Sequence, residues 1–125
     1  MTPEEVTAVL EQTGALLKGH FLLSSGLHSD RYVQCALALS QTGVAMFLGG
    51  ALARRCATGH VDLVAGPALG GIVIAHETAR GLGVPCIFAE RADGVMTFRR
   101  GFRVEPGQRV VIVEDVITTG KSVRE

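Results

Sequence analysis

The segment VVIVEDVITTGKS, residues 110–122, decides the fold class of this chain. Its first four residues are apolar and β-branched, as is typical of a parallel strand that is buried on both faces. Glu114 and Asp115 follow at once, and a short loop containing Gly120 and Ser122 comes next. A strand, an acidic pair, a small-residue loop and the start of a helix, in this order, predict an α/β protein. Its ligand loops should lie at the carboxyl ends of its strands.

Each part of this segment has a chemical use. The two carboxylates can accept hydrogen bonds from the diol of a sugar. The backbone N–H groups and hydroxyls of the loop can hold a phosphate, and the helix N-terminus adds partial positive charge. Gly120 allows a sharp turn close to a ligand. We therefore expect a site for a phosphorylated ribose. The simpler alternative is a strand followed by a solvated turn, but two adjacent acids at the end of a buried strand are costly without a role.

The same segment resembles the phosphoribosyl pyrophosphate (PRPP) motif of the type I phosphoribosyltransferases. The shared pattern is four apolar residues, two acids, two apolar residues, and small hydroxylated residues around a glycine. The resemblance implies the type I phosphoribosyltransferase fold, a parallel sheet flanked by helices with a small N-terminal hood. It also implies that PRPP is bound by nine consecutive residues: Glu114, Asp115, Val116, Ile117, Thr118, Thr119, Gly120, Lys121 and Ser122.

Length and composition bound the remaining possibilities. A chain of 125 residues is one domain, which we divide into an N-terminal helix and hood (1–40) and a core (41–125). The net charge of zero argues against a nucleic acid or an anionic membrane as partner. No apolar run approaches the ~20 residues of a membrane span. Three widely spaced cysteines indicate reduced thiols and a cytoplasmic location, and the four histidines lack metal-ligand spacing.

The N-terminal part predicts a helix and a hairpin. Thr2 and Glu5 form a capping box around Pro3, and the apolar spacing predicts that the helix continues to Lys18. Residues 20–35 then read as two short strands around a turn at 24–30. This segment resembles the hood of orotate phosphoribosyltransferases, which implies that Tyr32 and Val33 lie beside orotate. The alternative is that Tyr32 only packs on the first helix.

The middle of the chain alternates between helix and strand. We expect a helix over 42–56, a strand over 61–65, a loop over 66–71, a helix to about residue 82, and a strand over 84–89. Gly49 and Gly50 indicate close packing of the helix over 42–56 against a neighbouring element. A small-residue loop that leads into a helix is an anion site in principle. The resemblance assigns the pyrophosphate of PRPP to Ala68, Leu69 and Gly70, and the alternative is a plain strand-to-helix turn.

Residues 91–109 are the most basic stretch, with five arginines against two acids. The Asp93–Gly94 pair predicts a turn, and residues 96–104 a hairpin or an arm. In the family, a mobile basic loop at this place closes over the active site of the neighbouring subunit. The resemblance therefore implies a homodimer in which Arg91 acts in the partner's site, with Arg99 and Arg100 as further candidates. The alternative for Arg99 and Arg100 is a solvated basic hairpin.

The chain departs from the family pattern at three positions. Ser24, Gly70 and the Arg99–Arg100 pair stand where lysines are common. Arginine does not deprotonate in proteins, so no proton donor is assigned. The family also has further C-terminal strands and helices, including an arginine that meets orotate. We therefore expect this chain to be the N-terminal two thirds of an enzyme, with the C-terminal strands missing.

The expected activity is transfer of 5-phosphoribose from PRPP to orotate, which yields orotidine 5′-monophosphate and pyrophosphate in pyrimidine biosynthesis. Mg²⁺ is the implied cofactor, bridging substrate oxygens without direct protein ligands. Thr118 is also expected to touch orotate. Three alternatives stay open at this point: a purine phosphoribosyltransferase, a PRPP-binding regulator without turnover, and a chain that binds weakly and catalyses nothing by itself.

Overall fold

The computed structural model describes residues 2–22 and 26–117. Ser24 and the predicted phosphate loop, residues 118–122, lie outside the described residues. The described elements are α1 (Pro3–Gln12), β1 (Leu16–Leu22), β2 (His28–Val33), α2 (Cys35–Leu39), α3 (Thr42–Cys56), β3 (Leu63–Pro67), α4 (Gly71–Leu82), β4 (Cys86–Ala92), β5 (Val95–Phe98) and β6 (Val110–Ile112).

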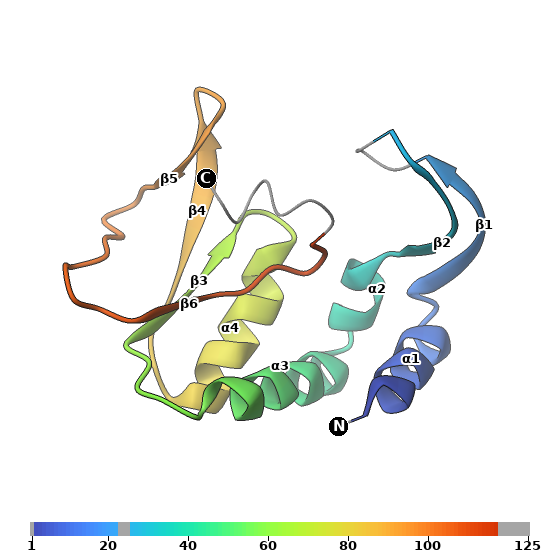
Figure 1. Cartoon of the computed structure of the whole chain (residues 1–125), viewed down its shortest axis with the longest axis horizontal. Helices are drawn as coiled ribbons and strands as arrows, with labels where there is room; N and C mark the ends of the chain where they lie inside the picture. Colours follow the sequence, from blue (N-terminus) through green and yellow to red (C-terminus); the bar gives the residue numbers. More distant parts are fainter. Residues whose placement is uncertain (1, 23–25, 118–125) are drawn as a thin grey trace.

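The predicted α/β architecture is confirmed (Figure 1). A four-stranded sheet has the order β5-β4-β3-β6, in which β4, β3 and β6 are parallel. The strand β5 pairs antiparallel with β4 through the turn that Asp93 and Gly94 predict. A separate hairpin of β1 and β2 forms the N-terminal hood and stands apart from this sheet (Figure 1).

The main core lies between the sheet and α4. Val64 of β3 and Val113, just after β6, are buried against three residues of α4: Ile74, Ala75 and Ala79. The backbone N–H of Val113 donates to the carbonyl of Ala65, which extends the β3–β6 ladder beyond Ile112. Burying apolar side chains at about 25 cal/mol per Å² makes this layer the main source of stability in the described part of the chain.

The opposite face of the sheet carries a smaller core. Leu63, Ala65 and Ile87 cluster there beneath Phe102, and Ile112 is 50% exposed. The prediction that residues 110–113 are buried on both faces is therefore wrong for Ile112. The reason is physical: on this face the described residues supply only Phe102 and Val110 as further cover, whereas α4 covers the other face.

The first helix is shorter than predicted. The capping box of Thr2 and Glu5 is present, because each side chain accepts from the other's backbone N–H, but α1 ends at Gln12. Gly14 has a φ of +75°, which favours glycine and stops the helix. Residues 16–18 then pair with residues 31–33 of β2. Cross-strand pairing thus overrides the helical spacing of Leu16 and Leu17.

Close packing of α3 on α4 explains one of two adjacent glycines. A Cβ on Gly49 would overlap Glu77, lying 2.6 Å from its carbonyl carbon, so a side chain there would push the helices apart. At Gly50 the nearest contact would be the Arg54 side chain at 3.7 Å. The prediction of close packing is confirmed for Gly49. The Cα of Gly50 also approaches α4, since a Cβ built on Gly81 would lie 3.6 Å from it, but a side chain at position 50 would have room.

The remaining boundaries differ by two or three residues. The predicted helix over 42–56 is confirmed, and α4 ends at Leu82 as expected. The strand β3 runs to Pro67 because parallel pairing joins residues 64–67 to residues 86–89, and β4 runs on to Ala92 because residues 89–92 pair antiparallel with β5. None of the helices in the described part of the chain is long and apolar enough to cross a membrane.

Candidate functional site

Three chain segments meet at the carboxyl edge of the parallel strands. The loop of residues 68–70 follows β3, Glu90 lies near the end of β4, and Glu114 with Asp115 follows β6. After β3 the chain forms β4 on one side of β3, and it later returns to form β6 on the other side of β3. The strand order therefore reverses between β3 and β6. In open α/β sheets, ligands bind in the crevice at this reversal point, beyond the carboxyl ends of the strands.

The loop and the acidic pair are in direct contact. A Cβ built on Gly70 would lie 2.7 Å from Asp115 Oδ2, and one on Gly71 would lie 3.2 Å from Glu114 Oε1. Both carboxylates thus pack over glycine backbone at the start of α4, which has no side-chain cap. The partial positive charge of a helix N-terminus favours negative groups at this position. Gly70, where the family often has lysine, leaves the space that the Asp115 carboxylate fills.

The acidic pair is electrostatically strained. Burial raises the pKa of Glu114 to about 7, and the neighbouring Asp115 carboxylate adds to the rise. Within residues 2–22 and 26–117, no cationic side chain forms an ion pair with either carboxylate. Two acids close together without a compensating cation are unfavourable for folding. A ligand or a cation that binds the two carboxylates would therefore gain more binding free energy here than elsewhere.

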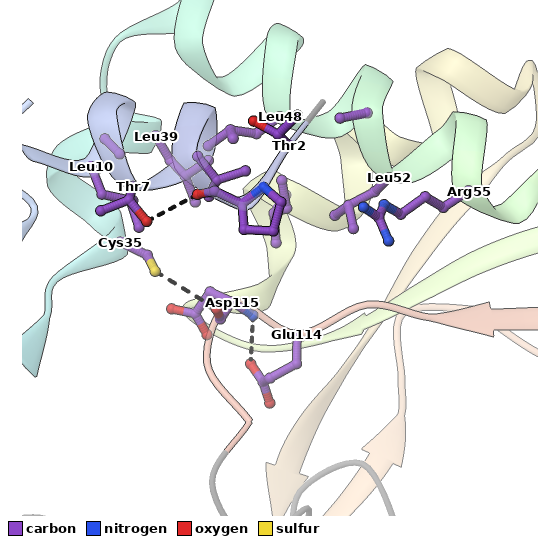
Figure 2. A pocket seen from close by; sticks show the side chains of 15 residues that line it. Thr2, Thr7, Leu10, Cys35, Leu39, Leu48, Leu52, Arg55, Glu114 and Asp115 are labelled. Atoms are coloured by element: carbon purple, nitrogen blue, oxygen red, sulfur yellow. Dashed lines mark hydrogen bonds between the residues drawn. The ribbon is translucent and has the colours of Figure 1, made fainter.

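The hood meets the acidic pair through Cys35. Its Sγ lies 3.6 Å from the backbone carbonyl of Asp115 (Figure 2), and burial together with the Asp115 charge raises the pKa of the Cys35 thiol. Cys35 begins α2 directly after the hood strand β2, which contains Tyr32 and Val33. The structure therefore brings the end of the hood to the acidic pair. Cys35 was not predicted as a site residue, and no sequence motif marks it.

Tyr32 and Val33 lie at the end of β2. The Tyr32 ring packs on the ring of Phe21 with centroids 5.6 Å apart and is 41% exposed, and Val33 is partly buried. The ring contact of Tyr32 therefore lies within the hairpin.

Beside the acidic pair, a cavity of about 620 Å³ is lined mostly by apolar residues of α1, α2 and α3 (Figure 2).

The basic stretch lies at the other edge of the sheet. Arg91 is on β4, and its guanidinium donates to the carbonyl of Gly94 across the turn. Arg99 and Arg100 follow β5, which borders β4 on the side away from β3 and β6. The structure thus does not bring Arg99 and Arg100 to the acidic pair of the same chain. Val116 and Ile117, in the predicted PRPP motif, follow the acids and are exposed.

Comparison with known proteins assigns the family. The phosphoribosyl transferase domain matches residues 41–125. The chain is 56% identical to an orotate phosphoribosyltransferase of Pelotomaculum thermopropionicum over all of its 125 residues, which are 66% of that relative. The crystal structure of orotate phosphoribosyltransferase from Aeropyrum pernix is 31% identical with a TM-score of 0.68, covering 95% of this chain and 69% of that one.

The fold also matches that of a structure solved with PRPP bound. The Mycobacterium tuberculosis orotate phosphoribosyltransferase bound to PRPP has a TM-score of 0.63 at 23% identity, over 96% of this chain and 69% of that one. The chain belongs to the phosphoribosyltransferase family. Within that family, its relatives at about half identity are orotate phosphoribosyltransferases, and it spans about two thirds of their length.

Proposed function

We propose that this chain carries the PRPP-binding part of an orotate phosphoribosyltransferase, which transfers 5-phosphoribose from PRPP to orotate. The observation that supports this most is the contact between the acidic pair and the glycine loop at the reversal point of the sheet. It lies where the family's PRPP motif and pyrophosphate loop are expected. The similarity to orotate phosphoribosyltransferases, rather than the fold, selects orotate as the base.

In the proposed reaction, the bond from the anomeric carbon to pyrophosphate breaks and its electron pair leaves with the pyrophosphate. A nitrogen of orotate forms the new bond and loses its proton. Glu114 and Asp115 would accept hydrogen bonds from the ribose hydroxyls, and their negative charge would stabilise the oxocarbenium-like transition state. The backbone of residues 68–70 would hold the pyrophosphate, while the loop predicted for the 5′-phosphate lies outside the described residues.

The site fits the Mg²⁺ ion that the family implies. A pyrophosphate held by residues 68–70 would lie beside the Glu114 and Asp115 carboxylates, and like charges at such distances repel. Hard oxygen donors are the ligands that Mg²⁺ prefers, and it is commonly bound through one or two carboxylates and substrate phosphates. When bound, the ion would neutralise charge on the departing pyrophosphate.

The proposal includes a cytoplasmic homodimer with shared sites. Arg91 is exposed on the hairpin of β4 and β5, at the edge of the sheet opposite to β6. That position suits a cation that serves the site of a partner copy. Measuring the molar mass in solution at several protein concentrations would test the assembly, and a monomer at all of them would contradict it.

The direct test is loss of orotate absorbance with PRPP and Mg²⁺. We would compare the 125-residue chain with the protein carried to its natural stop codon. Turnover by the longer protein is the expected result. Absence of turnover in both, with PRPP still bound, would instead support a PRPP-binding regulator.

A purine phosphoribosyltransferase is the second alternative. A competition assay with adenine, hypoxanthine and guanine in place of orotate would separate the two, because only one base class should yield a nucleotide. Preferential use of a purine would overturn the orotate assignment and leave the PRPP site intact.

A further inference from the structure

Two histidine side chains meet on the hood hairpin of β1 and β2. His20 Nε2 lies 2.6 Å from His28 Nδ1, and the two ring centroids are 4.8 Å apart at an interplanar angle of 85°. Both residues are exposed. Their separation of eight residues is not a metal-ligand spacing along the chain, which is why the sequence predicted no site here. The hairpin alone brings the two rings together.

A β-bulge in the hairpin sets the position of His20. The register shifts in the middle of the hairpin, where two residues of β1, Gly19 and His20, stand opposite the single residue Asp30. Such a bulge re-aims side chains, and glycine is common within one. Side chains alternate between the two faces of a strand, so Asp30 and His28 share one face of β2. His20, opposite Asp30, therefore lies diagonal to His28 on that face.

The two rings point their nitrogens at one position. At 2.6 Å one ring donates and the other accepts, so a single proton lies between His20 Nε2 and His28 Nδ1. In the neutral pair, the donor ring can carry this proton on its outward nitrogen instead. Each imidazole then presents a lone pair to the same point between the rings. Neutral imidazole nitrogens are the commonest metal ligands among protein side chains.

The observed geometry needs little change to hold an ion. Zinc binds imidazole nitrogens at about 2.0–2.1 Å in a tetrahedral arrangement, which places two such nitrogens about 3.3 Å apart. The rings would therefore separate by less than about 1 Å, and both side chains are exposed enough to rotate. By the alternation of side chains, Asp30 adds negative charge on the same face. Lys18 and Arg31, which pair across the two strands, lie on the other face.

We propose that His20 and His28 bind a divalent transition-metal ion, Zn²⁺, which joins β1 to β2. One bond forms from His20 Nε2 and one from His28 Nδ1, each ring keeps a proton on its outward nitrogen, and water fills the remaining positions. Imidazole suits borderline ions such as Zn²⁺, whereas Mg²⁺ prefers hard oxygen donors. The site is therefore chemically distinct from that for Mg²⁺ at the acidic pair, and it does not rest on the proposed function.

The ion would act on the hood more than on the core. The hood hairpin stands apart from the four-stranded sheet (Figure 1), and a two-stranded hairpin is at best marginally stable by itself. An ion that binds only the closed hairpin slows its opening by a factor that grows with the ion concentration. Because His28 begins β2, the link lies at the end of the hairpin away from Cys35. The role of Zn²⁺ is thus to keep the strands paired at that end.

The first experiment needs no variant. Zn²⁺ is titrated into the wild-type protein carried to its natural stop codon, without PRPP, and the histidine ring signals are followed by NMR. The His20 and His28 signals should shift together and saturate. The signal of His76, exposed on α4, should stay in place over the same range, and Mg²⁺ should shift none of the three. Unmoved His20 and His28 signals, or an equal shift of His76, would overturn the site.

The second experiment measures affinity by calorimetry. The His20→Ala and His28→Ala variants should each bind Zn²⁺ at least about tenfold more weakly than wild type, because one nitrogen alone cannot close a chelate. The matched control His76→Ala removes an exposed imidazole from α4 and should leave the affinity unchanged. Equal affinity in His20→Ala and wild type would overturn the proposal, and it is the result expected if Zn²⁺ binds the cysteine thiols instead.

The third experiment tests the link between the strands by hydrogen exchange. At a Zn²⁺ concentration about ten times the measured Kd, exchange of the β1 and β2 amides should slow by up to about tenfold, whereas α3 and α4 should not change. The His28→Ala variant should show no slowing. Saturated binding with unchanged exchange would overturn the role of the ion in pairing the strands. None of these measurements uses orotate turnover, so failure of the proposed function would leave their outcome readable.

Discussion

The acidic residues at the two ends of the parallel sheet have pKa shifts of opposite direction. At the amino end, Asp62 precedes β3 and accepts from the backbone N–H of Arg109 at 2.7 Å and bonds His60 at 2.6 Å. The hydrogen bond from Arg109 and the one with His60 hold the pKa of Asp62 below its ordinary value. At the carboxyl end, burial and Asp115 raise the pKa of Glu114 to about 7.

The difference shows which end is built for stability and which for a ligand. Asp62 joins the chain before β3 to the chain before β6, because the N–H of Asp62 also donates to the carbonyl of Arg109. The Asp62 carboxylate thus has hydrogen-bond partners in both Arg109 and His60. Glu114 and Asp115 pack against each other and against glycine instead. Carboxylates with perturbed pKa values are common at functional sites, because a ligand or cation supplies the partner that the protein does not provide.

The largest expected effect comes from neutralising the carboxyl end. Asp115→Asn keeps the shape of the side chain and removes charge-assisted hydrogen bonds to ribose, so kcat/KM should fall about 100-fold or more. Asp62→Asn is the matched change at the amino end and should leave kcat/KM within about twofold. Steady-state kinetics with PRPP and orotate measure both, and equal losses would contradict the division between the two ends.

The next effect concerns the contact between Gly70 and Asp115. A methyl group at position 70 would lie 2.7 Å from Asp115 Oδ2, so Gly70→Ala should rotate the carboxylate out of place and raise the KM for PRPP about tenfold. Gly43→Ala, where nothing lies within 4 Å, is the control and should leave the KM unchanged. An unaltered KM in Gly70→Ala would show that the close approach has no role in binding.

A smaller effect is expected for stability at the amino end. Asp62→Ala should lower the Tm by a few degrees at pH 7, because it removes the acceptor of Arg109. The folded pKa of Asp62 lies below the unfolded value of 3.8. Its contribution is therefore present above pH 3.8 and lost as the pH falls through the folded pKa. Calorimetry at pH 7 and pH 3 should show the Tm difference shrinking, and a constant difference would argue against an ionic origin.

The smallest effect has the opposite sign. The pKa of Glu114 rises on folding from 4.5 to about 7, so ionised Glu114 opposes folding. Below pH 4.5 the group is protonated in both states and there is no penalty, whereas above pH 7 the penalty is complete. Discounted for partial exposure, Glu114→Gln should stabilise the protein by about 1 kcal/mol at pH 8 and by little at pH 4.5. Urea denaturation at both pH values measures this, and a gain independent of pH would contradict it.

The sequence predicted the local elements well where one local cause dominates. The capping box of Thr2 fixed the start of α1, and the apolar spacing of residues 42–56 gave α3 with its observed bounds. It failed at Leu16 and Leu17, whose helical spacing lost to pairing with β2. It also failed at Ile112, since a run of β-branched residues does not reveal whether both faces of a strand are covered.

The same division holds for the site. The motif at residues 110–122 predicted Glu114 and Asp115 as site residues, and the loop after β3 predicted Gly70. No sequence pattern indicated that these two segments touch, or that Cys35 reaches Asp115 at 3.6 Å. The pairing of Glu90 with Arg100 was equally hidden, because it joins residues ten apart across a turn whose path depends on Arg100 adopting a positive φ.

The sequence by itself determined the family and most of the order of strand and helix, although not α2, and it predicted the chemistry of the acidic pair, since these follow from residue type and spacing along the chain. Only the tertiary structure decided which carboxylates are paired. Asp62 and Glu114 both end in a carboxylate. The sheet brings the backbone N–H of the distant Arg109 to Asp62, and it buries Glu114 beside its sequence neighbour Asp115. Electrostatic energy depends on distance and burial, and both are set when distant segments come together.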